Sequence, residues 1–114
     1  MKIIKRSESE VFKNGDTCEV NEYPFNDPNI NIGTAKLDGR FPNSGYLVNE
    51  TVKEYVYVVN GSGKIITESQ TIEFNVGDVV YIPAGEPYYW NAHCFLVMPC
   101  QPAWYPEQSK NIQE

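Results

Sequence analysis

The sequence predicts a single all-β domain of the sandwich or barrel type. Its 114 residues include eight glycines and eight prolines, which separate short apolar segments at close intervals, as is typical of all-β folds. No segment combines a helical hydrophobic period with capping residues. A chain of this length has room for one domain, so we assign residues 1–114 to it, with 101–114 as a polar tail packing outside the barrel.

The strongest strand signal is the segment 54–59, which is dense in β-branched and aromatic residues. The residues at 60–63, Asn-Gly-Ser-Gly, tolerate positive φ, so we predict a hairpin that returns along 64–67. Glycine and proline mark the other boundaries. Further strands are expected at 17–22, 30–37, 70–74, 79–82, 88–90 and 93–98, with turns at 75–78 and 83–87 and with Pro99 ending the last strand.

The charge balance excludes a general nucleic-acid-binding function. Fifteen acidic and nine basic residues give a net charge of −6, whereas phosphate contacts need clustered Lys and Arg. The N-terminus has no apolar run typical of a secretory signal, and no window is long enough for a membrane span. We therefore expect no nucleic-acid or membrane partner and a reducing cytoplasmic location with three free thiols, Cys18, Cys94 and Cys100.

Two sequence motifs resemble those of the cupin superfamily. Six residues separate Glu54 from Gly61, as they separate the Glu and Gly of the family's first motif. Gly77, Pro83 and Gly85 fit the spacing of the second motif. The resemblance covers most of the chain and is that of a small single-domain cupin. It implies a double-stranded β-helix, that is, a jelly-roll barrel with a pocket at its mouth.

The metal-binding histidines of that family are absent from this sequence. Depending on one residue of spacing, the first-motif pair falls at Leu47 and Asn49 or at Val48 and Glu50. Tyr88 takes the position of the second-motif histidine. The resemblance therefore implies the family's barrel with an altered set of pocket side chains.

The remaining donors do not predict a transition-metal site. Of the four usual ligands the chain keeps Glu54, and its single histidine, His93, begins the strand after the expected pocket position. A first-row metal needs three or more donors, with imidazole prominent. We expect no metal ligand set and no cofactor, while Glu50 and Glu54 leave open the weak binding of a hard divalent cation.

Glu54 and Tyr88 are the candidate catalytic residues. By period-2 alternation Glu54 shares a face with Val56 and Val58, so we expect it to point into the pocket above an apolar floor. Burial without a cation raises a carboxyl pKa, which suits a general acid or base. Tyrosine buries a ring and keeps a polar tip. A solvated Glu54 and a purely structural Tyr88 remain the alternatives.

Five further residues are expected to contact a ligand. An amide and a carboxylate supply polar groups, aromatic rings stack on sugars or ring systems, and an arginine holds a carboxylate or phosphate. A surface role for the arginine and a core role for the aromatic rings are the alternatives. These residues are Asn49, Glu50, Arg40, Tyr46 and Trp90.

Several functions fit this sequence, because a cupin scaffold does not determine chemistry. The first is a metal-independent protein that binds a small polar molecule, sugar-like or a carboxylate, in the barrel. The second is a metal-independent isomerase, epimerase or lyase with Glu54 as general acid or base. The others are a dioxygenase-like metal enzyme with unusual ligands and a non-catalytic structural or regulatory dimer. Tyr55 and Tyr57, on the face opposite Glu54, favour a homodimer.

Overall fold

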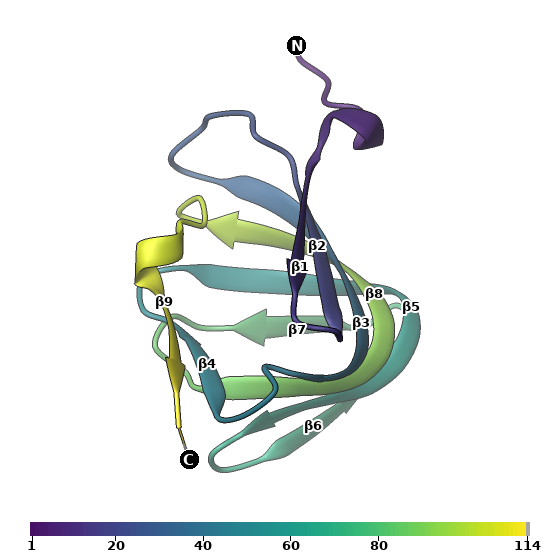
Figure 1. The fold of residues 1–114 in the computed structure, drawn as a ribbon, viewed down its shortest axis with the longest axis vertical. Helices are drawn as coiled ribbons and strands as arrows, with labels where there is room; N and C mark the ends of the chain where they lie inside the picture. The colour runs from purple at the N-terminus through teal and green to yellow at the C-terminus, as the bar shows by residue number, and fades with distance from the viewer. Residues whose placement is uncertain (114) are drawn as a thin grey trace.

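The computed structural model describes residues 1–113 and confirms the all-β prediction. Nine strands of the described chain form one antiparallel sheet that curls into an open barrel (Figure 1). Two single turns of 3-10 helix complete the fold. The elements are η1 Arg6–Glu8, β1 Glu10–Asn14, β2 Cys18–Glu22, β3 Asn31–Phe41, β4 Tyr46–Asn49, β5 Lys53–Thr67, β6 Thr71–Phe74, β7 Val79–Ile82, β8 Tyr88–Gln101, η2 Pro106–Gln108 and β9 Ser109–Ile112.

The two longest strands, β5 and β8, form the frame of the barrel. They pair from Lys53 and Gln101 to Thr67 and Tyr88, and they bend together at the closed end of the curl (Figure 1). β3 pairs with the other edge of β8 and continues the sheet to β2 and β1. β4 and β9 pair with each other, and β4 joins the start of β8. This topology leaves a concave space that faces β4 and β9.

The hairpin predicted at 60–63 is wrong. β5 runs without interruption through these residues, and a register shift between Val58 and Asn60 marks a bulge. Gly61 lies just after this bulge, has a positive φ of 81° and stays paired with Cys94 of β8. β8 is also continuous, so the predicted break at 91–92 and the predicted end at Pro99 are wrong as well.

Gly61 allows a close approach between β5 and β8. A methyl group there would collide with the backbone carbonyl oxygen of His93, and an L-residue at this φ is strained. We expect Gly61→Ala to lower the free energy of unfolding by about 2 kcal/mol or more, measured by urea denaturation. Gly85→Ala is the control, because Gly85 has a similar φ of +84° but open space around the added methyl group. Equal losses in the two variants would contradict the role assigned to Gly61.

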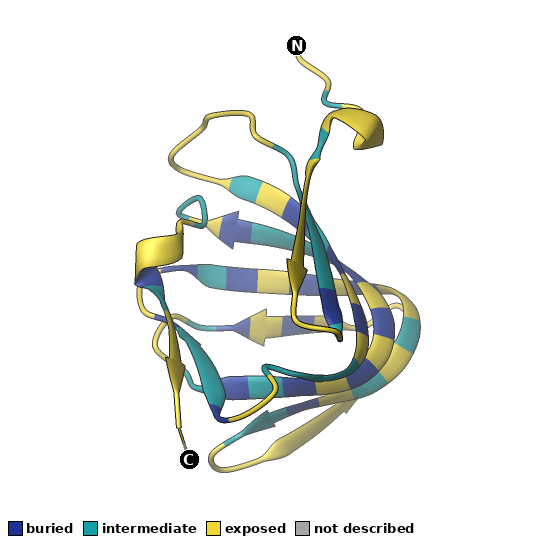
Figure 2. Ribbon diagram, in the orientation of Figure 1, coloured by how far each residue is buried: buried dark blue, intermediate teal, exposed yellow. Residues whose placement is uncertain are grey.

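The alternation of β5 places Glu54 on the inner face of the barrel. Glu54, Val56 and Val58 are buried, whereas Tyr55 and Tyr57 are exposed. Figure 2 shows the same alternation of buried and exposed residues along the long strands. Glu54 therefore shares the buried face of β5 with Val56 and Val58, as predicted, although the two valines do not line the cavity described below.

The outer face of β5 and β7 carries exposed aromatic side chains. Tyr55 and Tyr57 are 52% and 47% exposed. The Tyr55 ring stacks on Tyr81 of β7 with the ring centroids 4.9 Å apart. The homodimer expected from this face stays a prediction, and the molar mass measured by light scattering tests it.

The C-terminal segment differs from the predicted tail. The sequence predicts that 101–114 packs outside the barrel. In the structure, β9 pairs with β4, opposing Ser109 to Asn49, and the side chain of Gln108 is buried. Glu114 lies outside the described residues. No helix within residues 1–113 is long and apolar enough to cross a membrane.

Candidate functional site

A cavity of about 820 Å³ occupies the concave side of the sheet. Side chains from β1, β2, β3, β4, β5 and β8 line it, together with the segments that precede β3 and follow β8. Most of the lining residues are apolar or aromatic. The polar lining residues include two hydrogen-bonded groups, one around Glu54 and one around Glu22.

Asn49, the last residue of β4, organises the first polar group. Its Nδ2 donates a hydrogen bond to Oε1 of Glu54 over 2.8 Å. Its Oδ1 accepts hydrogen bonds from Nε1 of Trp104, at 3.2 Å, and from Nε2 of Gln108, at 2.9 Å. Because two donors hold Oδ1, the amide has one orientation and presents its NH2 group to Glu54.

Distant segments of the chain meet at Asn49. Oε1 of Gln108 accepts from the backbone N–H groups of Thr51 and Val52, both at 3.3 Å. The backbone N–H of Gly85, in the β7–β8 turn, donates to the carbonyl oxygen of Asn49 over 2.7 Å. The β4–β5 connection, the β7–β8 turn and the C-terminal segment therefore fix the position of Asn49 together.

Glu54 is buried, with 6% of its surface exposed. Among the described residues its carboxylate has one hydrogen-bond partner, Asn49, which leaves its second oxygen without a protein donor. Burial raises the pKa of Glu54 to about 7, against the opposing hydrogen bond from Asn49 and with a further contribution from the charge of Glu22. A carboxyl group with this pKa exchanges a proton near neutral pH.

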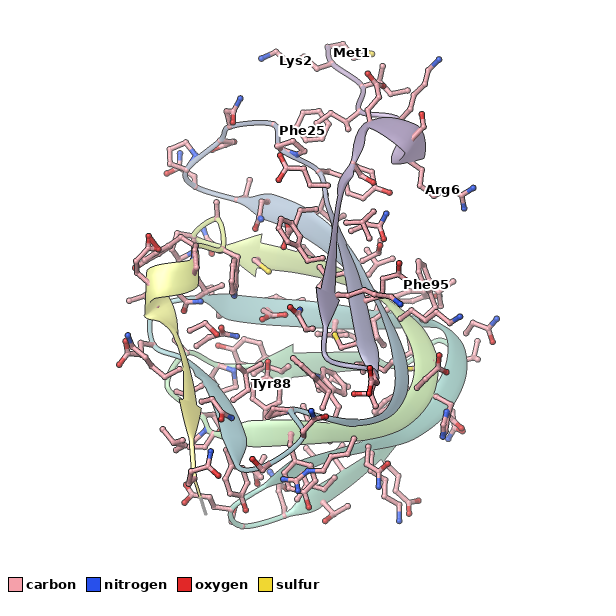
Figure 3. All side chains as sticks on the ribbon, in the orientation of Figure 1. Met1, Lys2, Arg6, Phe25, Tyr88 and Phe95 are labelled. Atoms are coloured by element: carbon pink, nitrogen blue, oxygen red, sulfur yellow. The ribbon has the colours of Figure 1, made fainter. Side chains whose placement is uncertain are left out.

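Tyr88 lies at the start of β8, opposite Leu47 of β4, with 2% of its surface exposed. Figure 3 shows its side chain inside the curl of the sheet. Burial, followed by the charge of Glu54, raises the pKa of Tyr88 well above its ordinary value. Tyr88 therefore stays a neutral phenol and a hydrogen-bond donor. Its ring meets Trp90 edge to face, with the centroids 5.9 Å apart.

The structure brings four of the predicted site residues together on the cavity wall: Glu54, Asn49, Tyr88 and Trp90. It also distinguishes the two spacings left open for the first motif. Leu47 and Asn49 line the cavity, whereas Val48 and Glu50 do not. Glu50 is exposed because it follows Asn49 and points to the opposite side. Its predicted ligand contact is therefore not part of this cavity.

Arg40 and Tyr46 also lie away from the cavity lining. The guanidinium of Arg40 sits 4.0 Å from the centre of the Tyr89 ring, and Nη2 donates to the carbonyl oxygen of Gly45 over 2.9 Å. Tyr46 packs on the same Tyr89 ring, with the centroids 5.6 Å apart. These contacts hold the guanidinium of Arg40 outside the cavity lining, so Arg40 does not supply a positive charge to the cavity.

Sequence reasoning missed the second polar group of the cavity. Oε2 of Glu22, at the end of β2, accepts a hydrogen bond from Nδ2 of Asn31 over 3.2 Å. Burial, and then the charge of Glu10 on β1, raise the pKa of Glu22. The available signal was period-2 alternation, since Glu22 shares a strand face with Cys18 and Val20.

The donor set of this cavity does not fit the metal centre usual for cupins. No three His, Cys, Asp or Glu side chains within residues 1–113 gather closely enough to hold a metal ion. His93 is exposed, and its Nδ1 lies 3.6 Å from Oδ1 of Asp38. All three cysteines are free and buried, and Cys18 and Cys100 line the cavity.

One family model and several solved structures are similar to this chain. A family model described as the EutQ-like cupin domain matches residues 41–98. Pac13, described as a unique nucleoside dehydratase, superposes with a TM-score of 0.89 at 17% identity, covering 99% of this chain and 92% of that chain. A Streptomyces Pac13 variant solved with uridine gives a TM-score of 0.87 at 18% identity, covering 99% and 93%.

Two further proteins are similar over different extents. The polyketide cyclase RemF of Streptomyces resistomycificus gives a TM-score of 0.75 at 16% identity, covering 100% of this chain and 87% of that chain. The 1-hydroxy-2-naphthoate 1,2-dioxygenase of Nocardioides sp. (strain KP7) is 47% identical over 34 residues, which is 30% of this chain and 9% of that protein. The match thus spans a small part of the dioxygenase, and the structural likenesses, at these identities, show the fold alone.

Proposed function

Because this chain belongs to the EutQ-like cupin domain family, we propose that it binds a small polar molecule in its barrel cavity without a metal ion. The observation that carries the proposal is Glu54, a buried carboxylate in the cavity wall with one oxygen that no group of residues 1–113 hydrogen-bonds. Because Glu54 lines the cavity, a ligand hydroxyl or amine can donate a hydrogen bond to this oxygen.

The composition of the cavity supports a small-molecule ligand. Apolar and aromatic walls with a few convergent polar groups are typical of ligand sites, and a volume of about 820 Å³ lies within their usual range. Asn49 and Glu54 are held in fixed orientations, and Tyr88 offers a phenol. A ligand with two or three polar atoms beside a ring or apolar group fits this pattern.

The metal-independent character rests on the donor set. Within residues 1–113, Glu54 belongs to no group of three His, Cys, Asp or Glu side chains that could hold a metal ion. The first-motif positions that line the cavity are Leu47 and Asn49. We expect elemental analysis of protein purified without chelator to find a first-row transition metal far below one equivalent. A stoichiometric transition metal that survives dialysis would contradict this part of the proposal.

Proton-transfer catalysis is the second candidate, and the pKa of Glu54 favours it. A carboxyl group with a pKa of about 7 both takes and returns a proton at neutral pH. Tyr88, a phenol on the same wall that stays neutral, would donate a hydrogen bond to the reacting group. Isomerases, epimerases and lyases need a group that removes a proton from the substrate and a proton that is returned to it. Pac13 and RemF, named as a dehydratase and a cyclase, are enzymes of the same barrel.

Ligand-induced stabilisation tests the proposed function. The probes are uridine, neutral sugars, small organic acids and small amines, added to the intact protein in a thermal unfolding assay. A ligand at about a hundredfold excess over its dissociation constant stabilises the native state by about 2.7 kcal/mol. We expect Glu54→Gln to weaken the effect of any stabilising probe, and to abolish turnover where a probe is converted.

Glu50→Gln is the matched control, because Glu50 is an exposed glutamate four residues away that does not line the cavity. We expect it to bind every probe like the unchanged protein. The proposal fails if no probe stabilises the protein, or if Glu50→Gln weakens binding as much as Glu54→Gln does.

A further inference from the structure

The cavity carries acidic side chains and no basic ones. Its described lining includes Glu10, Glu22, Asp27 and Glu54, whereas no Lys, Arg or His of residues 1–113 belongs to it. Inside a protein the low dielectric strengthens charge interactions. No basic side chain of the described lining therefore pairs with these acidic groups.

Glu22 and Glu54 are the two acidic groups held most firmly. Glu22 accepts a hydrogen bond from Nδ2 of Asn31, whose Oδ1 in turn accepts from the backbone N–H of Trp104 over 3.0 Å. Glu54 is held by Asn49, which also binds the indole of Trp104. Each carboxylate is therefore connected to Trp104 through one asparagine. The charge of Glu22 also contributes to the raised pKa of Glu54.

Each of the two carboxylates has an oxygen to offer to a ligand. Among the described residues Asn31 is the one side-chain donor to Glu22, and Asn49 is the one donor to Glu54. Glu54 is more than nine-tenths buried and lines the cavity. A cationic ligand in this cavity would therefore meet two acidic side chains that line the same space.

The aromatic residues of the lining suit the same kind of ligand. Phe12, Tyr23, Phe25, Trp90 and Trp104 line the cavity together with the carboxylates. Aromatic faces attract organic cations, and Trp is the strongest partner. An ammonium group attached to a ring or an apolar chain would therefore find both charge and ring partners.

We propose that the cavity selects its ligand by charge: it binds a molecule with a protonated amine beside a ring or apolar group on the wall that carries Glu22 and Glu54, and it discriminates against carboxylates and phosphates. Glu22 is the residue that sets this preference. The inference rests on the proposed small-molecule site and narrows the ligand class that the sequence left open, because it removes the carboxylate option.

Three probes of one shape and different charge test this inference: benzylamine, benzyl alcohol and benzoate. At a pH of about 8 they are a cation, a neutral molecule and an anion. Both tryptophans of the chain line the cavity, so binding is measured by tryptophan fluorescence on the intact protein. We expect benzylamine to bind at least tenfold more tightly than benzoate, with benzyl alcohol between them.

The variant Glu22→Gln tests the residue assignment. We expect it to weaken benzylamine about fivefold or more and to leave benzyl alcohol unchanged. Glu19→Gln is the control, since Glu19 is a glutamate of the same strand outside the cavity lining. Preserved benzylamine binding in Glu22→Gln, or equal losses in the two variants, overturns the role of Glu22.

The three probes also separate this inference from the proposed function. Benzoate that binds as tightly as benzylamine overturns the charge preference but leaves a working small-molecule site. No response to any of the three probes counts against both. Because the ranking is measured on the unchanged protein, it decides the charge preference even if Glu22→Gln does not fold.

Discussion

At a pH of about 8, the variant Glu54→Gln is expected to be more stable than the unchanged protein by about 3 kcal/mol in its free energy of unfolding. Glu54 has a pKa of about 7 in the folded protein, raised from its ordinary value of 4.5. Each unit of difference corresponds to about 1.4 kcal/mol. Glutamine carries no charge at any pH, so the variant avoids the cost of burying an ionised carboxylate.

The sign of the pH dependence follows from the same difference. Between 4.5 and about 7 the folded protein keeps a proton on Glu54 that the unfolded chain has lost. Stability is therefore highest at low pH in this window, decreases as the pH rises to about 7, and is constant above that value. The pKa of Glu22 is also raised, which changes stability with pH in the same direction. The variant Glu54→Gln should therefore still lose some stability as the pH rises, but less than the unchanged protein.

Urea denaturation at several pH values between about 5 and 8 measures this effect. The comparison includes Glu50→Gln, which removes one exposed glutamate from the adjacent segment and should keep the full slope of the unchanged protein. If Glu54→Gln is equally or less stable at a pH of about 8, then Glu54 is not buried in the state that the structure describes.

The second large effect is expected for Asn49→Leu, which should lose about 4 kcal/mol of stability. The substitution removes the partner of two polar groups on buried side chains, Oε1 of Glu54 and Nε2 of Gln108, and of the half-buried Nε1 of Trp104. A buried donor or acceptor left without a partner costs about 1 to 3 kcal/mol. The pKa of Glu54 should also rise further, because its stabilising donor is gone.

Asn91→Leu is the matched control for this substitution. Asn91 is an exposed residue of β8 outside the cavity lining, and its side chain makes no hydrogen bond within the described residues. We expect its free energy of unfolding to change by less than about 0.5 kcal/mol. Comparable losses in the two variants would show that Asn49 does not organise the buried group.

Local sequence patterns predicted the parts of the fold that depend on neighbouring residues. The alternation of 54–59 correctly placed Glu54 inside and Tyr55 outside. The turn predicted at 75–78 also forms, with hydrogen bonds between Asn75 and Asp78. Gly61 misled the prediction, because a glycine with positive φ serves a hairpin and a bulge equally. Only the pairing with β8 distinguishes the two, and that pairing involves residues thirty or more positions away.

The candidate site was predictable where one strand face determines it. Glu54, Asn49 and Tyr88 follow from alternation and from the motif spacing. Trp104 and Gln108 could not be predicted in this way, because they lie 55 and 59 positions after Asn49 in the sequence. The polar residues around them also resemble those of a solvated tail. Arg40 was expected to bind an anion from its chemistry alone, whereas the structure engages it with Tyr89.

The protonation state of Glu54 tests most directly the claim that the barrel holds one buried, proton-exchanging carboxyl group. An NMR titration of the side-chain carboxyl carbons of the glutamates, with Glu54→Gln to assign the signal, measures its pKa. We expect a midpoint of about 7 for Glu54, raised from its ordinary value of 4.5. A midpoint near 4.5 would place Glu54 in water and contradict both the site and the function proposed for it.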